Sequence, residues 1–207
     1  MDSIFGYKIS DSSYPQMKVI ETHKFIFRPV DFNDLNDIYE YLSQEKVVKY
    51  LPFKAHKNTS ATKKFIKYFF IDNYKRGKVG NYAVYYKPDK KVIGNVGFNN
   101  IFPNSKKGEI GICINPKYWG NNFSTEITIV CLITGFELLN LNKIVAVTYS
   151  QNKYAPKSLN NLGFKYIKTS KPRNNLPMSH TFELTRKEYL KLKKEYLPHL
   201  IKSFVFK

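Results

Sequence analysis

The chain has 207 residues, 43% of them hydrophobic, which is enough for one domain with a sizeable core and appended termini. No apolar run reaches membrane-spanning length and the N-terminus lacks the layout of a secretory signal, so we expect a cytoplasmic protein with no membrane partner. The formal net charge is +18, yet only four of the basic residues are arginines, which favours a solvated lysine-rich surface over direct nucleic-acid recognition.

The N-terminal part predicts a strand followed by an amphipathic helix. Residues 1–22 show no clean period and are expected to form a lead-in. His23–Val30 predicts the first strand, which ends at Pro29, and Asp31 is one of the N-cap candidates after it. Apolar residues then recur at three- and four-residue spacing, as one buried helix face requires: Leu35, Ile38, Tyr39 and Leu42.

A loop, a second helix and a hairpin follow. Val47–Asn58 is rich in aromatic residues without periodicity, which predicts a loop. Ser60 is the expected cap of a helix that runs to Lys75. Asn81–Lys87 and Lys91–Ile101 are strands joined by a proline-aspartate turn, so they should pair as a hairpin.

The most informative stretch is GEIGICINPKYWGNNFSTE, Gly108–Glu126. Glu109–Ile114 alternates and predicts a central strand, and the turn formers Gly120, Asn121 and Asn122 follow it. Ser124 opens an apolar run to Leu139 that is long enough for a helix. A helix that starts directly after such a loop leaves its first N–H groups unpaired, which predicts an anion site made of main chain.

The remaining elements complete a mixed sheet. Lys143–Ser150 is a β-branched strand, and because a helix separates it from the central strand, the two should be parallel through a right-handed crossover. Ligands in such sheets lie where neighbouring strands part. Asn152–Phe164 contains a short helix, followed by a strand through Lys168, a last strand at Met178–Leu184 and a lysine-rich helix at Thr185–Tyr196.

Two motifs resemble the GNAT superfamily of acyl-CoA N-acyltransferases. Tyr118–Glu126, YWGNNFSTE, is similar to its pyrophosphate loop, and the closest match is the branch of ribosomal-protein N-terminal acetyltransferases. Asn122 replaces the second glycine of that pattern and Ser124 replaces its small alanine. A second family pattern has the spacing found here at Asn152, Ala155, Gly163 and Phe164.

The resemblance implies a fold and a domain plan. It implies an α+β fold of the GNAT type, with a mostly antiparallel sheet of about six to seven strands that is splayed between the central strand and the following one. About four helices would flank this sheet. The acetyltransferase domain would span residues 23–190, and residues 191–207 would form a helical tail.

The resemblance also implies acetyl-CoA as co-substrate, bound by the loop and by main-chain pairing along the central strand. The implied cofactor-binding residues are Ile112, Cys113, Ile114, Trp119, Gly120, Asn121, Asn122, Phe123, Ser124 and Asn152.

Candidate acid–base groups are few. Glu109 could accept the amine proton through a water or orient the ammonium group, or it could be an exposed glutamate paired with Lys106 or Lys107. His56 and His180 are weaker candidates. The tyrosine of many relatives is Leu159 here, so Ser158 or water would protonate the departing thiolate.

The acceptor is an amine of open identity. The resemblance favours a protein N-terminus, with a small-molecule amine as the rival, and Tyr50, Phe53 and His56 would shape its pocket unless they are core packing. Two further hypotheses are a GNAT-type fold that binds acyl-CoA without turnover and a lysine-rich RNA binder. We expect no metal, nucleic acid only indirectly through a ribosome, and a monomer or homodimer.

Overall fold

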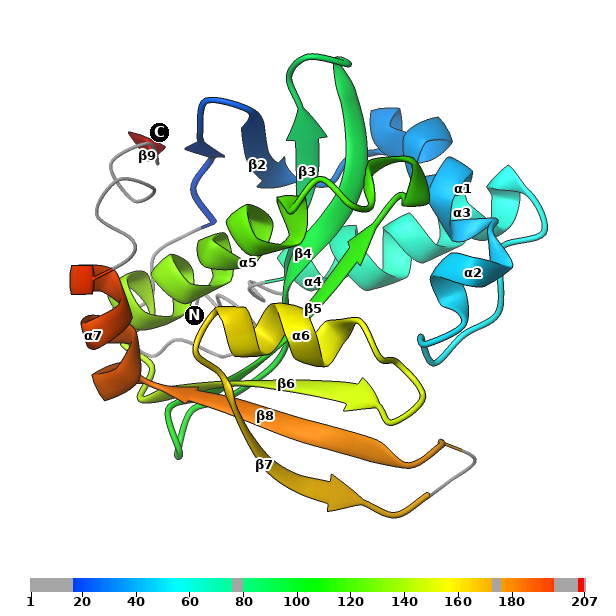
Figure 1. The fold of residues 1–207 in the computed structure, drawn as a ribbon. Helices are drawn as coiled ribbons and strands as arrows, with labels where there is room; N and C mark the ends of the chain where they lie inside the picture. The colour runs from blue at the N-terminus through cyan, green and yellow to red at the C-terminus, as the bar shows by residue number, and fades with distance from the viewer. Residues whose placement is uncertain (1–16, 76–79, 173–175, 196–204, 207) are drawn as a thin grey trace.

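One mixed sheet organises the described part of the chain, which in this computed structural model comprises residues 17–75, 80–172, 176–195 and 205–206 (Figure 1). Its nine strands lie in the order β7-β8-β6-β5-β4-β3-β2-β1-β9. Neighbours are antiparallel except β5 and β6, which are parallel. The strands are β1 (Ile20–Glu21), β2 (Phe25–Pro29), β3 (Asn81–Tyr86), β4 (Lys91–Phe102), β5 (Lys107–Ile114), β6 (Lys143–Tyr149), β7 (Lys165–Ser170), β8 (Ser179–Thr185) and β9 (Val205–Phe206).

Helices cover both faces of this sheet. Figure 1 shows α5 and α6 on the near face, whereas α1, α3 and α4 lie on the other side. The helices are α1 (Leu35–Leu42), α2 (Glu45–Val48), α3 (Thr59–Phe65), α4 (Asp72–Lys75), α5 (Phe123–Ile133), α6 (Ala155–Asn161) and α7 (Arg186–Glu195). The π-helical turn Ile66–Ile71 joins α3 to α4, the π-helical turn Thr134–Leu138 extends α5, and Phe32–Asp34 and Pro116–Tyr118 are 3-10 turns.

Strand alternation divides the core into two clusters. Phe25 and Phe27 of β2 point toward α5, where Ile127 and its neighbours form the larger cluster. On the opposite face, Ala83 of β3 packs in a second cluster with Tyr41 and the other buried residues of α1, with those of α2, and with Ile66 and Phe70 of the π-helical turn after α3. The sheet is therefore buried on both sides.

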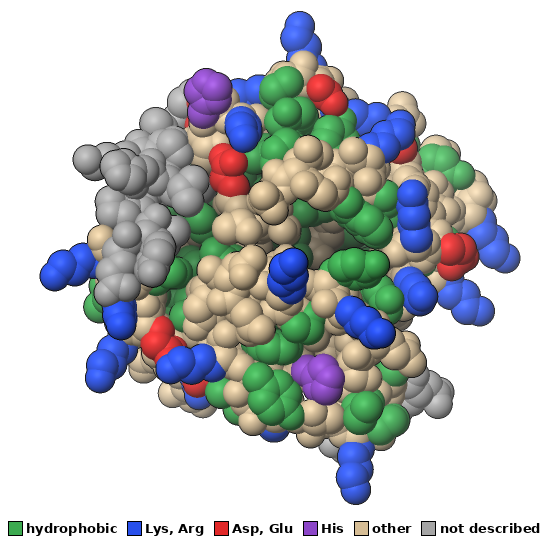
Figure 2. Space-filling view, viewed as in Figure 1, with side chains coloured by type: hydrophobic (Ala, Val, Ile, Leu, Met, Phe, Trp, Pro, Cys, Tyr) green, Lys and Arg blue, Asp and Glu red, His purple; other side chains and the backbone are tan. Residues whose placement is uncertain are grey.

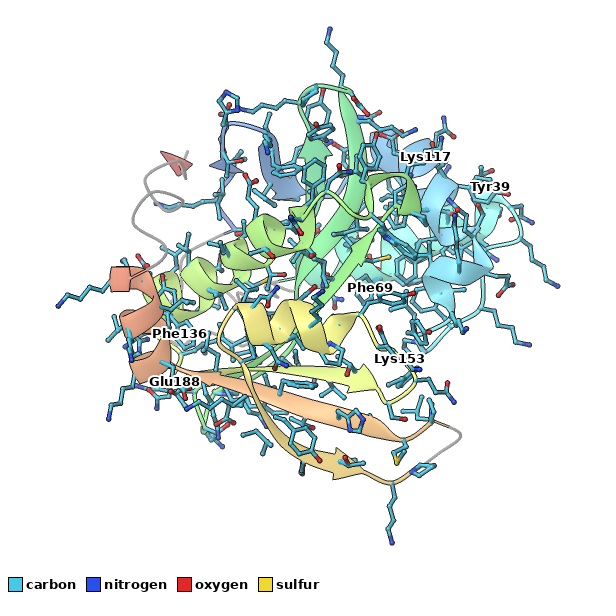
Figure 3. The ribbon with its side chains drawn as sticks, viewed as in Figure 1. Tyr39, Phe69, Lys117, Phe136, Lys153 and Glu188 are labelled. Atoms are coloured by element: carbon cyan, nitrogen blue, oxygen red, sulfur yellow. The ribbon has the colours of Figure 1, made fainter. Side chains whose placement is uncertain are left out.

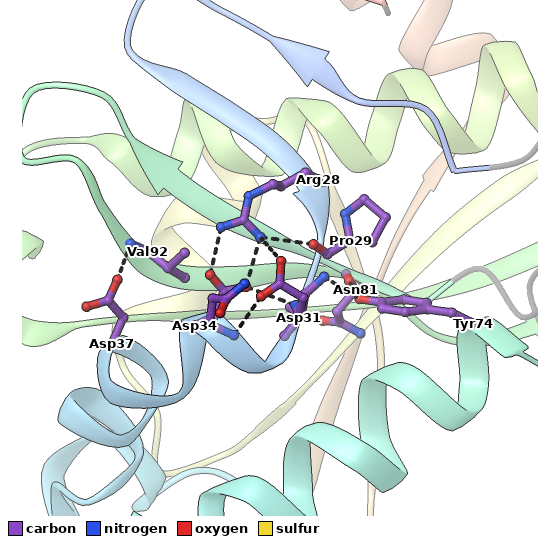
Figure 4. Close-up of polar contacts among 10 residues, drawn as sticks. Arg28, Pro29, Asp31, Asp34, Asp37, Tyr74, Asn81 and Val92 are labelled. Carbon is purple, nitrogen blue, oxygen red and sulfur yellow. Dashed lines mark hydrogen bonds and ion pairs between the residues drawn. The ribbon is translucent and has the colours of Figure 1, made fainter.

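Polar contacts attach the α1 layer to the sheet (Figure 4). Arg28 of β2 donates to both carboxylate oxygens of Asp34, at 2.8 and 2.7 Å, and Asp34 is almost fully buried. Asp31 caps the 3-10 turn that leads into α1 in a reciprocal capping box with Asp34. Tyr74 of α4 donates to the carbonyl of Asn81 on β3. Both ends of the helical layer are thus hydrogen-bonded to strands.

The predicted order of elements is confirmed, with corrections at their edges. Ile20–Glu21 forms β1 within the predicted lead-in, and Val205–Phe206 pairs with it as β9, so the prediction of a helical tail is wrong there. Isolated Val and Phe favour an available strand edge over a helix. Residues 1–16 of the lead-in, and 196–204 and 207 of the tail, lie outside the described residues.

Helix starts also differ from the predictions. Asn58, not Ser60, caps α3 through its side-chain oxygen, and Glu45–Val48 is a helical turn at the edge of the predicted loop. On α1 the buried aromatic residue is Tyr41, whereas Tyr39 is half-buried. Among the described residues, no helix combines the length and apolarity needed to cross a membrane.

Candidate functional site

The sheet opens between β5 and β6, as predicted. Their parallel pairing runs from Lys107 with Lys143 to Ile110 with Ala146. Beyond those positions β5 continues only with β4, and β6 continues only with β8. Figure 2 shows this face of the molecule hollowed at its centre, between the start of α5 and α6. A ligand could therefore enter the sheet where these two strands part.

The start of α5 lies beside this opening. Its N-cap residue, Asn122, has the left-handed conformation with φ 58° and makes no side-chain capping bond. Gly120 has φ +85°, and a Cβ added there would meet no atom within 4 Å. The first N–H groups of α5 are thus left for a ligand, and the helix dipole favours an anionic one. The helix begins at Phe123, one residue before the predicted Ser124.

A carboxylate holds the segment before this loop against α1. The buried Asn115 accepts from the Lys117 backbone N–H at 3.1 Å and donates to Oε1 of Glu40 at 3.0 Å. Nζ of Lys117, visible in Figure 3, lies 2.9 Å from the same oxygen. Partial burial alone would raise the pKa of Glu40, but hydrogen bonds from Lys91, Lys117 and Asn115 lower it to about 2. Glu40 is therefore ionised at neutral pH and fixes the strand-to-loop turn.

Aromatic residues anchor the loop from its other side. Phe123 is buried, with ring centroids of Phe25 and Tyr86 at 5.1 and 5.2 Å. Tyr118 packs edge-on to Tyr86 at 5.6 Å and donates to Asp89 at 2.5 Å. The side chain of Phe123 is consequently unavailable to a ligand, and only its main chain can bind one.

Trp119 and Asn121 make contacts within the loop itself. The indole N–H of Trp119 donates to the carbonyl of Ile114 at 2.8 Å, and 51% of the residue is exposed. Asn121 donates its side-chain amide to the carbonyl of Tyr118 at 3.3 Å. Both bonds stabilise the loop conformation and leave the indole ring at the surface.

Helix α6 brings a serine to the start of α5. Oγ of Ser158 lies 3.5 Å from Oγ of Ser124. The side-chain oxygen of Asn152 accepts from the N–H groups of Tyr154 and Ala155, so Asn152 fixes the start of α6. Ser158 therefore lies with the groups predicted to bind the diphosphate.

The two faces of β5 carry different residues. Ile112 and Ile114 alternate with Cys113, and Ile112 is partly exposed, at 39%. Cys113 packs against the second cluster, behind the sheet, where desolvation raises the pKa of its thiol to about 12. Glu109 is on the same face as Cys113, opposite α5, and none of the described ion pairs joins it to Lys106 or Lys107. Cys113 as a residue is half-buried, and its side chain packs against this cluster, which leaves its main chain as the group that can pair with a ligand in the opening.

Asn99 is a candidate that the sequence analysis missed. A bulge in β4 at this position shifts the register from Phe98–Ile110 to Asn100–Glu109. The side chain of Asn99 lies over Gly111, where an added Cβ would be 2.6 Å from its Nδ2. Gly111 is the first residue of β5 beyond the parallel pairing, so the Asn99 amide lies at the opening. A glycine inside a strand pattern was the available signal.

The predicted acceptor residues lie on the face opposite α5. Nδ1 of His56 is 2.9 Å from Oγ1 of Thr62, and its ring centroid is 5.8 Å from Phe53 and 5.2 Å from Phe65. Burial lowers the pKa of His56, which keeps the ring neutral at pH 7. A surface pocket of about 460 Å³ opens beside it. Tyr50 has no described ring contact with Phe53 or His56, and Nζ of Lys49 lies 5.6 Å from the centroid of its ring.

His180, the other histidine considered, lies on the β6 side of the opening, opposite Thr148 of β6, and not on the face that carries Phe53 and His56. It is on β8, and its Nδ1 lies 2.9 Å from Oγ1 of Thr169 on β7, the edge strand of the sheet. His180 and Thr169 are cross-strand partners of β8 and β7, so this contact is what strand pairing alone would give.

Comparisons with known proteins agree with this geometry. A family model described as an acetyltransferase (GNAT) domain matches residues 24–165. An uncharacterized N-acetyltransferase, p20, from Bacillus licheniformis is 27% identical over 177 residues, covering 84% of this chain and 99% of that protein.

Two solved structures show the likeness of fold. Ribosomal-protein-S5-alanine acetyltransferase from Vibrio fischeri is 20% identical with a TM-score of 0.69, covering 84% of this chain and 99% of that one. Spermidine N-acetyltransferase from Vibrio cholerae, in complex with CoA and spermine, is 18% identical with a TM-score of 0.68, covering 81% and 98%. Together with the sheet described above, these matches confirm the predicted fold class.

Proposed function

The chain belongs to the acetyltransferase (GNAT) family, and from this premise we propose that it transfers an acetyl group from acetyl-CoA to the N-terminal amine of a polypeptide. The observation that carries the proposal is the opening of the sheet between β5 and β6 next to the uncapped start of α5. An acyl thioester whose carrier contains a diphosphate needs both features. The opening can hold the extended chain that carries the thioester, and the start of α5 can bind the negatively charged diphosphate.

Acetyl-CoA supplies an activated acetyl group as a thioester, and the residues of the opening suit it. The N–H groups of 120–124 would bind the diphosphate, with the Ser158 hydroxyl beside them. The space around Gly120 leaves room for close approach. Main-chain groups of Ile112–Ile114, which lack a β6 partner, would pair with the extended arm as a neighbouring strand does.

The amine would approach from the face that carries Glu109. A carboxylate there can accept the amine proton through a water molecule or hold the ammonium group before it loses that proton. Asn99, over Gly111 on the same face, can hydrogen-bond the acceptor. Because Ser158 lies at the diphosphate end, we assign protonation of the thiolate to water.

A polypeptide N-terminus is favoured over a polyamine on electrostatic grounds. A formal net charge of +18 repels a polycation such as the ligand of the Vibrio cholerae spermidine enzyme. The structural neighbour from Vibrio fischeri, whose name gives a ribosomal-protein alanine as its target, supports the ribosomal-protein branch. RNA binding is the less favoured role, because Phe25, Phe27 and Phe123 are buried. The exposed rings of Tyr68, Trp119, Tyr154 and Tyr166 belong to four separate segments instead of forming a row on one strand.

Two measurements test the proposal in sequence. Calorimetric titration with acetyl-CoA should give saturable heat, whereas a fold without a cofactor site would give none. A thiol-release assay should then show turnover with N-terminal peptides and little with spermidine. Binding without turnover on any amine would instead support a catalytically inactive acyl-CoA-binding protein.

A further inference from the structure

The pocket beside His56 is lined by cations and by no carboxylate. Its volume is about 460 Å³, and Lys54, Lys57 and Lys64 surround it together with His56 and Ser60. Asn58, which also lines it, uses its side-chain oxygen to cap α3. Three lysines in one pocket lining place like charges near one another, and a bound anion would reduce their repulsion.

The surrounding segment has the same sign of charge. Residues 46–71 contain seven lysines and no aspartate or glutamate. Lys67 has a partner outside the segment, Asp72 at 3.1 Å, but none of the described ion pairs involves the three lysines of the pocket. Figure 2 shows Lys and Arg side chains gathered on the right of this face, where α2 and α3 lie. The segment thus presents a positive field to an incoming acceptor.

Aromatic rings connect the pocket with β5. The His56 ring packs against Phe53 and Phe65, and Phe65 stacks on Phe69 with centroids 4.8 Å apart. Phe69, labelled in Figure 3, and Cys113 of β5 pack against the same buried cluster. The pocket therefore adjoins the buried cluster that packs against Cys113, on the face of β5 that also carries Glu109.

We propose that this lysine pocket is an acceptor subsite that binds an acidic side chain of the polypeptide whose N-terminal amine is acetylated. The inference rests on the proposed function and adds a substrate class to it: N-termini followed by Asp or Glu. An extended chain advances about 3.3 Å per residue, so residues at positions two to six of a peptide sample distances of up to about 17 Å from its N-terminal amine.

The test is a thiol-release assay on peptides that differ only in placing Glu or Gln at each of positions two to six. We expect kcat/KM to be about three- to tenfold higher for Glu than for Gln at one or two of these positions, an advantage that salt reduces. Lys54→Ala, Lys57→Ala and Lys64→Ala should each remove part of this preference while the acetyl-CoA Kd stays unchanged. Lys168→Ala, an exposed lysine on β7, is the matched control and should retain it.

A charge reversal gives a gain of function that misfolding cannot imitate. The double variant Lys57→Glu, Lys64→Glu, which leaves one lysine and two glutamates in the lining, should lose the preference for Glu peptides and acquire one for peptides with Lys at the same position. An equal kcat/KM for Glu and Gln peptides at every position would overturn the subsite while leaving acetyl transfer intact. Acetylation of free acidic amino acids with the same kcat/KM as the Glu peptides would overturn it too. Absence of acetyl-CoA binding and of turnover on every peptide would instead refute the proposed function itself.

Discussion

Replacing Gly120 with alanine tests whether the main chain of the loop before α5 binds the diphosphate. Gly120 has φ +85°, and an added Cβ would meet no atom within 4 Å. Since no neighbour is displaced, the perturbation is confined to the backbone, where a left-handed L-residue costs about 1–2 kcal/mol. The loop can respond by keeping its conformation at that cost or by relaxing to negative φ.

We expect relaxation, because Gly120 precedes the helix and is surrounded by open space. Relaxation turns the amide groups away from the ligand, so the Kd for acetyl-CoA should rise about five- to thirtyfold, which corresponds to about 1–2 kcal/mol. The free energy of unfolding should fall by less than about 0.5 kcal/mol. Calorimetry measures the Kd for acetyl-CoA, and urea denaturation measures the free energy of unfolding.

Gly163→Ala is the matched control for this change. Gly163 has φ +79° at the turn between α6 and β7, and its added Cβ would meet Leu184 at an ordinary 3.6 Å. It imposes the same backbone cost away from α5, so stability should fall and the acetyl-CoA Kd should not change. The reasoning fails if both variants weaken binding equally or if Gly120→Ala binds as tightly as the wild type.

Three further substitutions separate the remaining roles. Glu40 has a pKa lowered to about 2 from 4.5, so its contribution to stability is present above about pH 4.5 and is lost as the pH falls toward 2. Glu40→Gln should therefore lower the free energy of unfolding by about 1 kcal/mol at pH 7. Urea titrations should show this difference between wild type and variant shrinking below pH 4.5. A difference independent of pH would contradict the ion-pair explanation. Glu109→Gln should lower kcat/KM by about 10²-fold or more with no change in acetyl-CoA Kd, and an unchanged kcat/KM would exclude Glu109 as base. Ser158→Ala should raise the acetyl-CoA Kd about two- to fivefold and leave kcat unaltered, whereas a fall in kcat alone would show that Ser158 protonates the thiolate.

The sequence predicted the opening of the sheet because the signals for it are local. The alternation of Glu109–Ile114, the turn formers after it and the apolar run to Leu139 fix the order strand, loop, helix within one short segment. Contacts between distant residues gave no such signal. Glu40 binds Asn115 across 75 positions, and nothing in the sequence around either residue indicates the pairing. The bulge at Asn99 depends on the register with the partner strand, and Gly111 within the strand pattern was the one local sign of it.

The position of Asn122, where the resemblance expected glycine, can be explained by what flanks the loop. Its φ of 58° is one that asparagine tolerates better than other residues with a side chain. On one side the buried ring of Phe123 fixes the first turn of α5, and on the other the contacts of Glu40 fix Asn115 and Lys117. Because both ends of the loop are held, the left-handed conformation does not depend on glycine at this position. The remaining freedom is at Gly120, and for this reason we regard Gly120, more than Asn122, as the residue on which binding of the diphosphate depends.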